Sequence, residues 1–120
     1  RTSFLQPAVS VAPVAQPEEV LGAAAIRLAI RRRKKIALAY SDNSGQKTRR
    51  VIWPILLGYR DTSRIIAAWC ELRMGFRYFR TERIVEADAL EDSIPRRMDL
   101  LRAEWRNATD AERRRYEEGT

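Results

Sequence analysis

The sequence predicts a mainly β domain: five short strands in a small, strongly bent sheet that closes into a barrel, with one helix before it and a helical extension after it. Three observations support this fold class. Apolar residues recur with a period of two in short runs after residue 35, turn-forming residues separate the runs, and Pro54 interrupts the second run. We divide the 120 residues into an interdomain linker (1–17), a barrel with its N-terminal helix (18–92) and the C-terminal extension (93–120).

The linker is defined by its composition. Residues 5–17 contain three prolines and no charge, which is typical of an extended tether and unfavourable for a helix. The chain begins at Arg1 without a methionine, so we expect a fragment of a longer protein in which the tether attaches an upstream domain. A disordered tail is the alternative interpretation.

A helix is predicted from Pro17-Glu18-Glu19 to about Arg33, because proline is tolerated and carboxylates are favourable in a first turn. Its apolar face comprises Leu21, Ala25, Leu28 and Ala29. The basic residues 31–35 complement the negative end of the helix dipole. Because this run exceeds what a helix end requires, contact with a phosphate backbone is a second interpretation.

Five β runs follow, at residues 36–40, 48–59, 65–72, 76–80 and 84–89. Asp42-Asn43-Ser44-Gly45 is a strong turn signal after the first run, and residues 60–63 form the next turn. Pro54 cannot donate to a ladder, so the second strand is expected to bend there, at an edge, bulge or barrel corner. Met74-Gly75 is predicted to be a two-residue turn, which would place Arg80 opposite Trp69 and Arg77 opposite Leu72.

The C-terminal extension is predicted to contain two helices. The first begins near Ile94-Pro95 and presents Leu100, Leu101 and Trp105 on one face. Thr109-Asp110-Ala111-Glu112 forms a capping box for the second helix. The apolar face needs a partner surface, which is either the barrel or a second copy of the chain.

Positive charge is concentrated in the middle of the chain. The formal net charge is +7, and residues 20–90 hold 15 Lys and Arg against 6 Asp and Glu, whereas the flanking segments are slightly acidic. A positive field over one compact unit attracts polyanions, of which phosphate backbones are the commonest. A basic protein whose charge serves only solubility is the alternative.

The residue types present argue against several classes of protein. Without histidine the chain lacks the usual general base, the usual zinc ligand and any Ser-His-acid triad. The single cysteine, Cys70, cannot form an internal disulfide or a multi-cysteine metal site, and we interpret it as a small buried hydrophobe rather than a reactive thiol. No apolar stretch is long enough to span a membrane. We therefore expect a cytoplasmic, non-catalytic protein without cofactor or metal.

The segment 67–84 interleaves four arginines with four aromatic residues. Guanidinium groups bind phosphate oxygens bidentately and aromatic rings stack on bases, so this combination is typical of a surface that binds single-stranded nucleic acid. The alternative is a barrel strand with aromatic residues in the core and arginines on a solvated face, and for Trp69 and Phe79 we favour the core. The arginines, which have few acidic neighbours in the sequence, are the leading candidate site: Arg73, Arg77, Arg80 and Arg83.

The order of motifs between residues 20 and 92 is distinctive. A strand ending in Tyr40 precedes Arg50-Val51-Ile52-Trp53-Pro54, and Ala68-Trp69-Cys70-Glu71-Leu72-Arg73 is followed by Arg77-Tyr78-Phe79-Arg80-Thr81-Glu82-Arg83-Ile84. This order resembles the WYL domain, most specifically in Arg-x-Phe-Arg-x-x-Arg-Ile after Cys-x-Leu-Arg. One departure is plain: the tripeptide that names the family falls at Arg64-Ile65-Ile66, so its Trp and Tyr are absent.

The resemblance implies an Sm-like, SH3-type barrel, usually C-terminal to a helix-turn-helix domain in bacterial transcription regulators and often dimeric. It also implies an effector, with single-stranded nucleic acid the best-supported class, bound by basic residues that match Arg50, Arg77, Arg80 and Arg83. Arg73 and Tyr40 match less decisively. Together with Trp69, these residues are the site that we predict for nucleic acid or another anionic ligand.

Three functional hypotheses remain open at this point. The first is a sensor, in which single-stranded DNA or RNA neutralises the arginines and biases the arrangement of a homodimer, while an upstream domain absent from this chain binds duplex DNA. The second is a dimerisation module whose charge assists duplex binding without an effector of its own. The third is a sensor of a small anionic metabolite.

Overall fold

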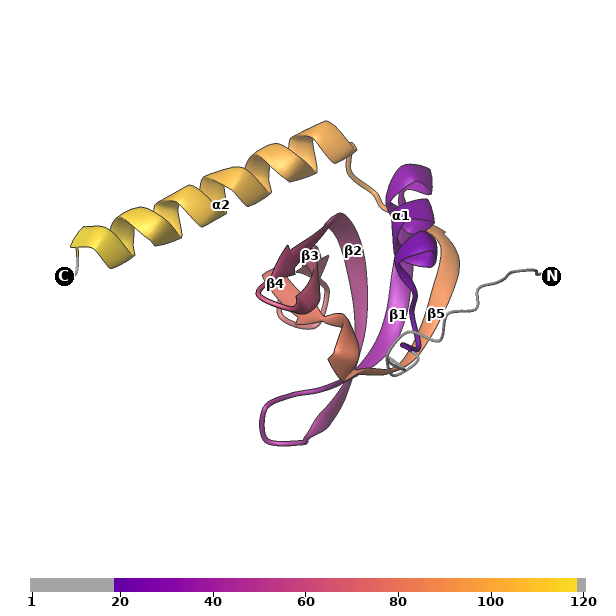
Figure 1. Ribbon diagram of the computed structural model, residues 1–120. Helices are drawn as coiled ribbons and strands as arrows, with labels where there is room; N and C mark the ends of the chain where they lie inside the picture. The colour runs from indigo at the N-terminus through magenta and orange to yellow at the C-terminus, as the bar shows by residue number, and fades with distance from the viewer. Residues whose placement is uncertain (1–18, 119–120) are drawn as a thin grey trace, which may run out of the picture.

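The computed structural model describes residues 19–118, with side chains to residue 115 (Figure 1). The predicted linker, 1–17, lies outside the described residues. The elements in chain order are α1 (Ala23–Arg32), β1 (Lys34–Ser41), β2 (Lys47–Arg60), β3 (Ser63–Cys70), β4 (Gly75–Arg80), the 3-10 helix η2 (Thr81–Arg83), β5 (Ile84–Ser93) and α2 (Met98–Glu118). Neither helix of this described part is long and apolar enough to cross a membrane.

The five strands form one antiparallel sheet in the order β4-β3-β2-β1-β5. This confirms the predicted mainly β class with flanking helices. The predicted closure of the sheet into a barrel would require hydrogen bonds between the two edge strands, β4 and β5. Within residues 19–118 no such pairing is present, and η2 carries the chain from one edge of the sheet to the other. Alternating apolar residues predict strands, but they do not show whether the first and last strands of the sheet pair to close a barrel.

Strand β2 bends at Pro54, as predicted. Its register against β3 shifts between Pro54 and Leu56, so Ile55 is the extra residue of a bulge. The bulge inverts the alternation of the strand: Trp53 and Ile55 belong to one hydrophobic core, and Leu57 packs against the other. One strand therefore contributes to cores on both sides of the sheet.

The two cores have different covers. In the first core, Ile26 and Ala29 of α1 pack with apolar residues of the sheet, among them Ile36, Ile52 and Phe79. In the second core, residues of β2, β3 and β4 meet the start of α2; its members are Trp53, Ile55, Ile94 and Leu101, with Trp69, Phe76, Met98 and Trp105 against them. The sheet thus lies between α1 and the first turns of α2.

The structure corrects the predicted start and face of the first helix. Helix α1 begins at Ala23, after Gly22, and has no acidic residue in its first turn. Glu19 instead bonds the side chains of Arg64 and Thr81, which holds the preceding segment against β3 and η2. The buried face also differs from the predicted one. Ile26 is buried with Ala29, the predicted face residues Ala25 and Leu28 are exposed, and Leu21 is buried ahead of the helix.

Two further predictions were wrong in register or extent. The turn after β3 spans residues 71–74, so Trp69 lies opposite Phe76 rather than Arg80, and Arg77 lies opposite Ala68. The predicted capping box at 109–112 lies inside α2, which is one continuous helix (Figure 1). The Thr109 hydroxyl there is 3.5 Å from the hydroxyl of Tyr78 on β4, so it contacts the sheet and caps nothing.

Candidate nucleic-acid interface

Arg50 on β2 is the best-defined member of the predicted site. Its guanidinium lies over two rings of the first core, 5.9 Å from the centroid of Tyr40 and 5.6 Å from that of Phe79. These rings pack edge to face, with centroids 5.1 Å apart, and are buried. Nε of Arg50 donates to Thr48 Oγ1 over 3.0 Å and Nη1 to Cys70 Sγ over 3.7 Å. The side chain is therefore held in place by aromatic and polar contacts.

Arg50 carries an uncompensated charge. It forms no ion pair with any residue whose side chain the structure describes, 19–115. Guanidinium has five N–H donors in a planar fork, and the contacts above engage only part of that fork. The remaining donors are suited to the oxygens of a phosphate or carboxylate.

Arg77 lies on the same face of the sheet as Arg50. On β4, Arg77 is two residues from Phe79 and two from Gly75, so alternation places all three on one side. A Cβ built on Gly75 would be 3.6 Å from Arg77 Nη1, and Gly75 pairs directly with Cys70, the residue that Arg50 contacts. The Arg50 guanidinium therefore lies beside Cys70 and the Arg77 guanidinium beside Gly75, where Arg77 Nη1 also donates to the Phe76 carbonyl over 2.8 Å.

Arg80 does not join this face. Arg80 is three positions after Arg77 on β4, so the two side chains leave the strand on opposite sides. Its Nη1 donates to Ser63 Oγ over 2.8 Å, and that hydroxyl donates to Glu82 over 3.3 Å. Its backbone N–H donates to the hydroxyl of Tyr40 over 3.0 Å, so the contribution of Arg80 to the site is to fix the ring beneath Arg50.

The other predicted residues lie around this face or away from it. Trp69 stacks on Trp53 at 4.5 Å in the second core, on the α2 side of the sheet, in agreement with its predicted core role. Arg73 is exposed in the turn before β4, and Arg83 is half-buried in η2. The structure thus places Arg50 and Arg77 on one face of the sheet, near the paired residues Cys70 and Gly75, and Arg80 and Trp69 outside that face.

The two acidic residues nearest in sequence to the arginines are occupied elsewhere. Glu71 accepts from Lys35 Nζ over 2.7 Å and from the indole N–H of Trp53 over 2.8 Å. These hydrogen bonds, that of Lys35 first, hold the pKa of Glu71 below its ordinary value. Glu82 accepts from Ser63. Neither forms an ion pair with the candidate arginines, and no sequence motif indicated these partners.

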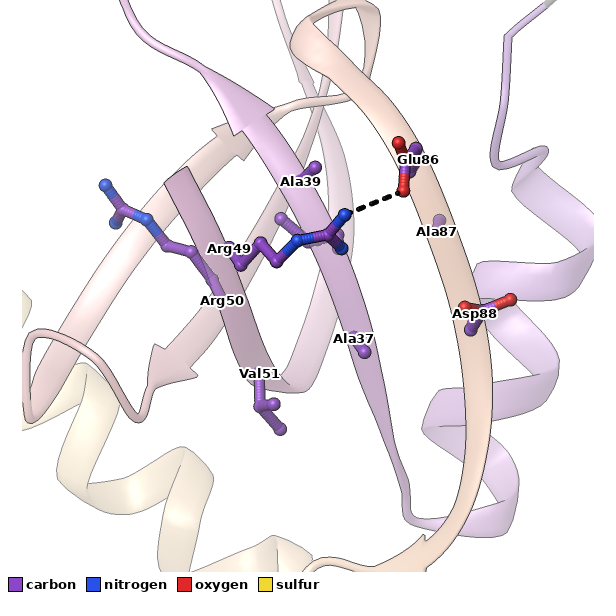
Figure 2. Close-up of a pocket in the computed structure, with 9 residues that line it drawn as sticks. Ala37, Ala39, Arg49, Arg50, Val51, Glu86, Ala87 and Asp88 are labelled. Carbon is purple, nitrogen blue, oxygen red and sulfur yellow. Dashed lines mark hydrogen bonds and ion pairs between the residues drawn. The ribbon is translucent and has the colours of Figure 1, made fainter. Parts of the chain in front are cut away.

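The opposite face of the same strands holds a shallow depression of about 250 Å³ (Figure 2). The small side chains of Ala37 and Ala39 on β1 form its floor. Figure 2 shows Arg49 pointing across β1 to Glu86 on β5, at 3.4 Å, whereas Arg50 points to the other side of β2. With Asp88 also lining it, this depression is partly neutralised and less suited to an anion.

The fold and the site define a small antiparallel β domain. On one face it carries two arginines, Arg50 and Arg77, that form no ion pair with the described side chains. The WYL domain family matches residues 23–89, more than half of the chain, so the chain belongs to the WYL domain family. Among solved structures, the proteasome accessory factor B/C (PafBC) of Arthrobacter aurescens is similar at 27% sequence identity with a TM-score of 0.56, covering 60% of this chain and 12% of that one. The chain thus spans a small part of that protein. No curated protein matched the chain.

Proposed function

We propose that this domain is the ligand-sensing regulatory domain of a cytoplasmic bacterial transcription regulator, and that it binds single-stranded nucleic acid or another anionic effector without catalysing a reaction. Membership of the WYL domain family supports the regulatory role. The observation on which the ligand class rests is the Arg50 guanidinium, held over Tyr40 and Phe79 and unpaired among the described residues.

The burial of the rings defines what kind of contact the site makes. Tyr40 is 8% exposed and Phe79 is 1% exposed, so these rings support Arg50 and are not available to stack on bases. Arg50 and Arg77 then bind phosphate oxygens, with Arg73 and Arg83 at the margins. Phosphate contacts carry no sequence information directly, so we expect strong salt dependence and little sequence preference.

Strand preference tests this proposal. Fluorescence anisotropy of labelled single-stranded and duplex oligonucleotides is measured at about 50 and 200 mM salt, with the wild type, Arg77→Ala and Arg113→Ala. Arg113 is exposed on α2 and is not one of the candidate site residues, so Arg113→Ala removes the same charge from another element. We expect tighter binding of single strands, because a flexible single strand can bring phosphates to both guanidinium groups on one small face. We also expect a loss of about threefold to tenfold for Arg77→Ala only. Equal, weak binding of both oligonucleotides by all three proteins would refute the proposal.

A dimerisation module is the second candidate, and an exposed residue of α2 favours it. Leu101 is buried in the second core, while Leu100, the residue before it, is 49% exposed. A dimer that Leu100→Glu dissociates in sedimentation equilibrium, combined with the absence of any Arg77→Ala effect on single strands, would favour this function over the sensor.

A further inference from the structure

A second cleft lies away from the Arg50 face, between α1, β2 and α2. It has a volume of about 250 Å³ and is lined by Arg27, Ile30, Arg31, Ile55, Leu56, Leu57 and Arg102. We propose that this cleft binds a small amphiphilic carboxylate, with its apolar body on β2 and its carboxylate between the arginines of the two helices. This proposal is independent of the nucleic-acid interface.

The floor of the cleft is apolar because of the bulge in β2. The extra residue, Ile55, directs the chain so that three consecutive apolar residues, 55–57, border the same space, together with Ile30 of α1. Leu56 is 44% exposed although it lies in mid-strand. An exposed leucine between the buried Ile55 and the half-buried Leu57 leaves apolar surface that a ligand can remove from water.

The rim of the cleft is cationic and holds no carboxylate. Arg27 and Arg31 lie one turn apart on α1, and Arg102 faces them from α2. Among the side chains of residues 19–115, none of the three forms an ion pair, and no Asp or Glu lines the cleft. Like charges four residues apart are unfavourable on a helix, so an anion bound between them removes a repulsion as well as forming new bonds.

Size and polarity select the class of ligand. The cleft is at the small end of ligand pockets, so it accommodates a short aliphatic chain or a single ring. A planar carboxylate matches the donor fork of a guanidinium, and an apolar body matches the leucine and isoleucine floor. A purely polar anion such as acetate leaves that floor in water.

Titration with sodium octanoate and sodium benzoate, followed by backbone amide NMR shifts of the whole chain, tests the proposal. Acetate and octan-1-ol are the controls for the apolar body and for the charge. Arg102→Gln is compared with Arg106→Gln, an exposed residue one turn further along α2 that does not line the cleft. Both variants are checked for an unchanged amide spectrum away from the substitution.

We expect saturable shifts at residues of α1, of the β2 bulge and of α2 with at least one of the two carboxylates, and none with the controls. Arg102→Gln should weaken binding by about fivefold or more, and Arg106→Gln by less than about twofold. Absence of saturation with both carboxylates, equal affinity of Arg102→Gln and the wild type, or shifts confined to the Arg50 face would overturn the proposal. Arg50 does not line this cleft, so Arg50→Ala should leave carboxylate binding unchanged. Failure of the carboxylate proposal can therefore be told apart from failure of the nucleic-acid interface.

Discussion

Arg49 and Arg50 are neighbours on β2, yet their surroundings differ in every respect that matters for binding. Arg49 is 80% exposed at its side chain and pairs with Glu86 across β1. Arg50 is half-buried, lies over two aromatic rings and has no acidic partner among the described residues. Net charge does not distinguish the two. What distinguishes them is whether the fold neutralises the guanidinium or holds it in place unpaired.

The largest expected effect is on the free energy of unfolding, and it separates the Arg50 face of β4 from the face toward α2. Phe79 supports Arg50 from the first core, while the adjacent Tyr78 is 42% exposed on the α2 side of β4. Phe79→Ala should lower the free energy of unfolding by about 3–5 kcal/mol, since it leaves a cavity in a buried core. Tyr78→Ala should cost about 1 kcal/mol. Urea unfolding measures both, and equal costs would contradict the assignment of faces.

The hydroxyl of Tyr40 offers a subtler change to the Arg50 face. Tyr40→Phe retains the ring beneath Arg50 but removes the acceptor of the Arg80 N–H. We expect a loss of about 1–2 kcal/mol in unfolding free energy, because a half-buried donor loses its partner, with single-strand affinity nearly unchanged. A large loss of affinity at unchanged stability would show instead that the hydroxyl contacts the ligand.

Glu71 provides the smallest test, through pH. Its pKa is lowered in the folded state by Lys35 and Trp53, from an ordinary value of 4.5. The stability that it contributes is therefore present above about pH 4.5 and is lost as the pH falls through the lower, folded pKa. Between pH 5 and pH 3 the wild type should lose more of its unfolding free energy than Glu71→Gln does, by a small amount because the Glu71 side chain is 35% exposed. Parallel pH profiles of unfolding for the two proteins would contradict this role.

The sequence predicted the strands, the bend at Pro54 and the family, because alternation, proline chemistry and motif order are local properties. It misplaced the first helix, since nothing local shows that Glu19 bonds Arg64 and Thr81 across the fold. The same limit applied to the candidate site. A turn of 71–74 in place of 74–75 changed every pair between β3 and β4, and with it the partners of Arg77 and Arg80.

The amphiphile cleft was not predicted because its residues come from three elements that are distant in the sequence. Arg31 was interpreted as part of the basic run at the end of the helix, Arg27 was not singled out, and Leu56 was one residue of a β run. Only the bulge at Ile55 and the approach of α2 place them around one space.

The central claim is tested most directly by comparing Arg49→Ala with Arg50→Ala in single-strand binding at low salt. Both variants remove one positive charge from adjacent positions, so any difference reports the site and not the net charge. We predict that Arg50→Ala loses about tenfold or more in affinity, while Arg49→Ala stays within about twofold of the wild type. Equal losses for the two variants, or an unchanged Arg50→Ala, would contradict the account.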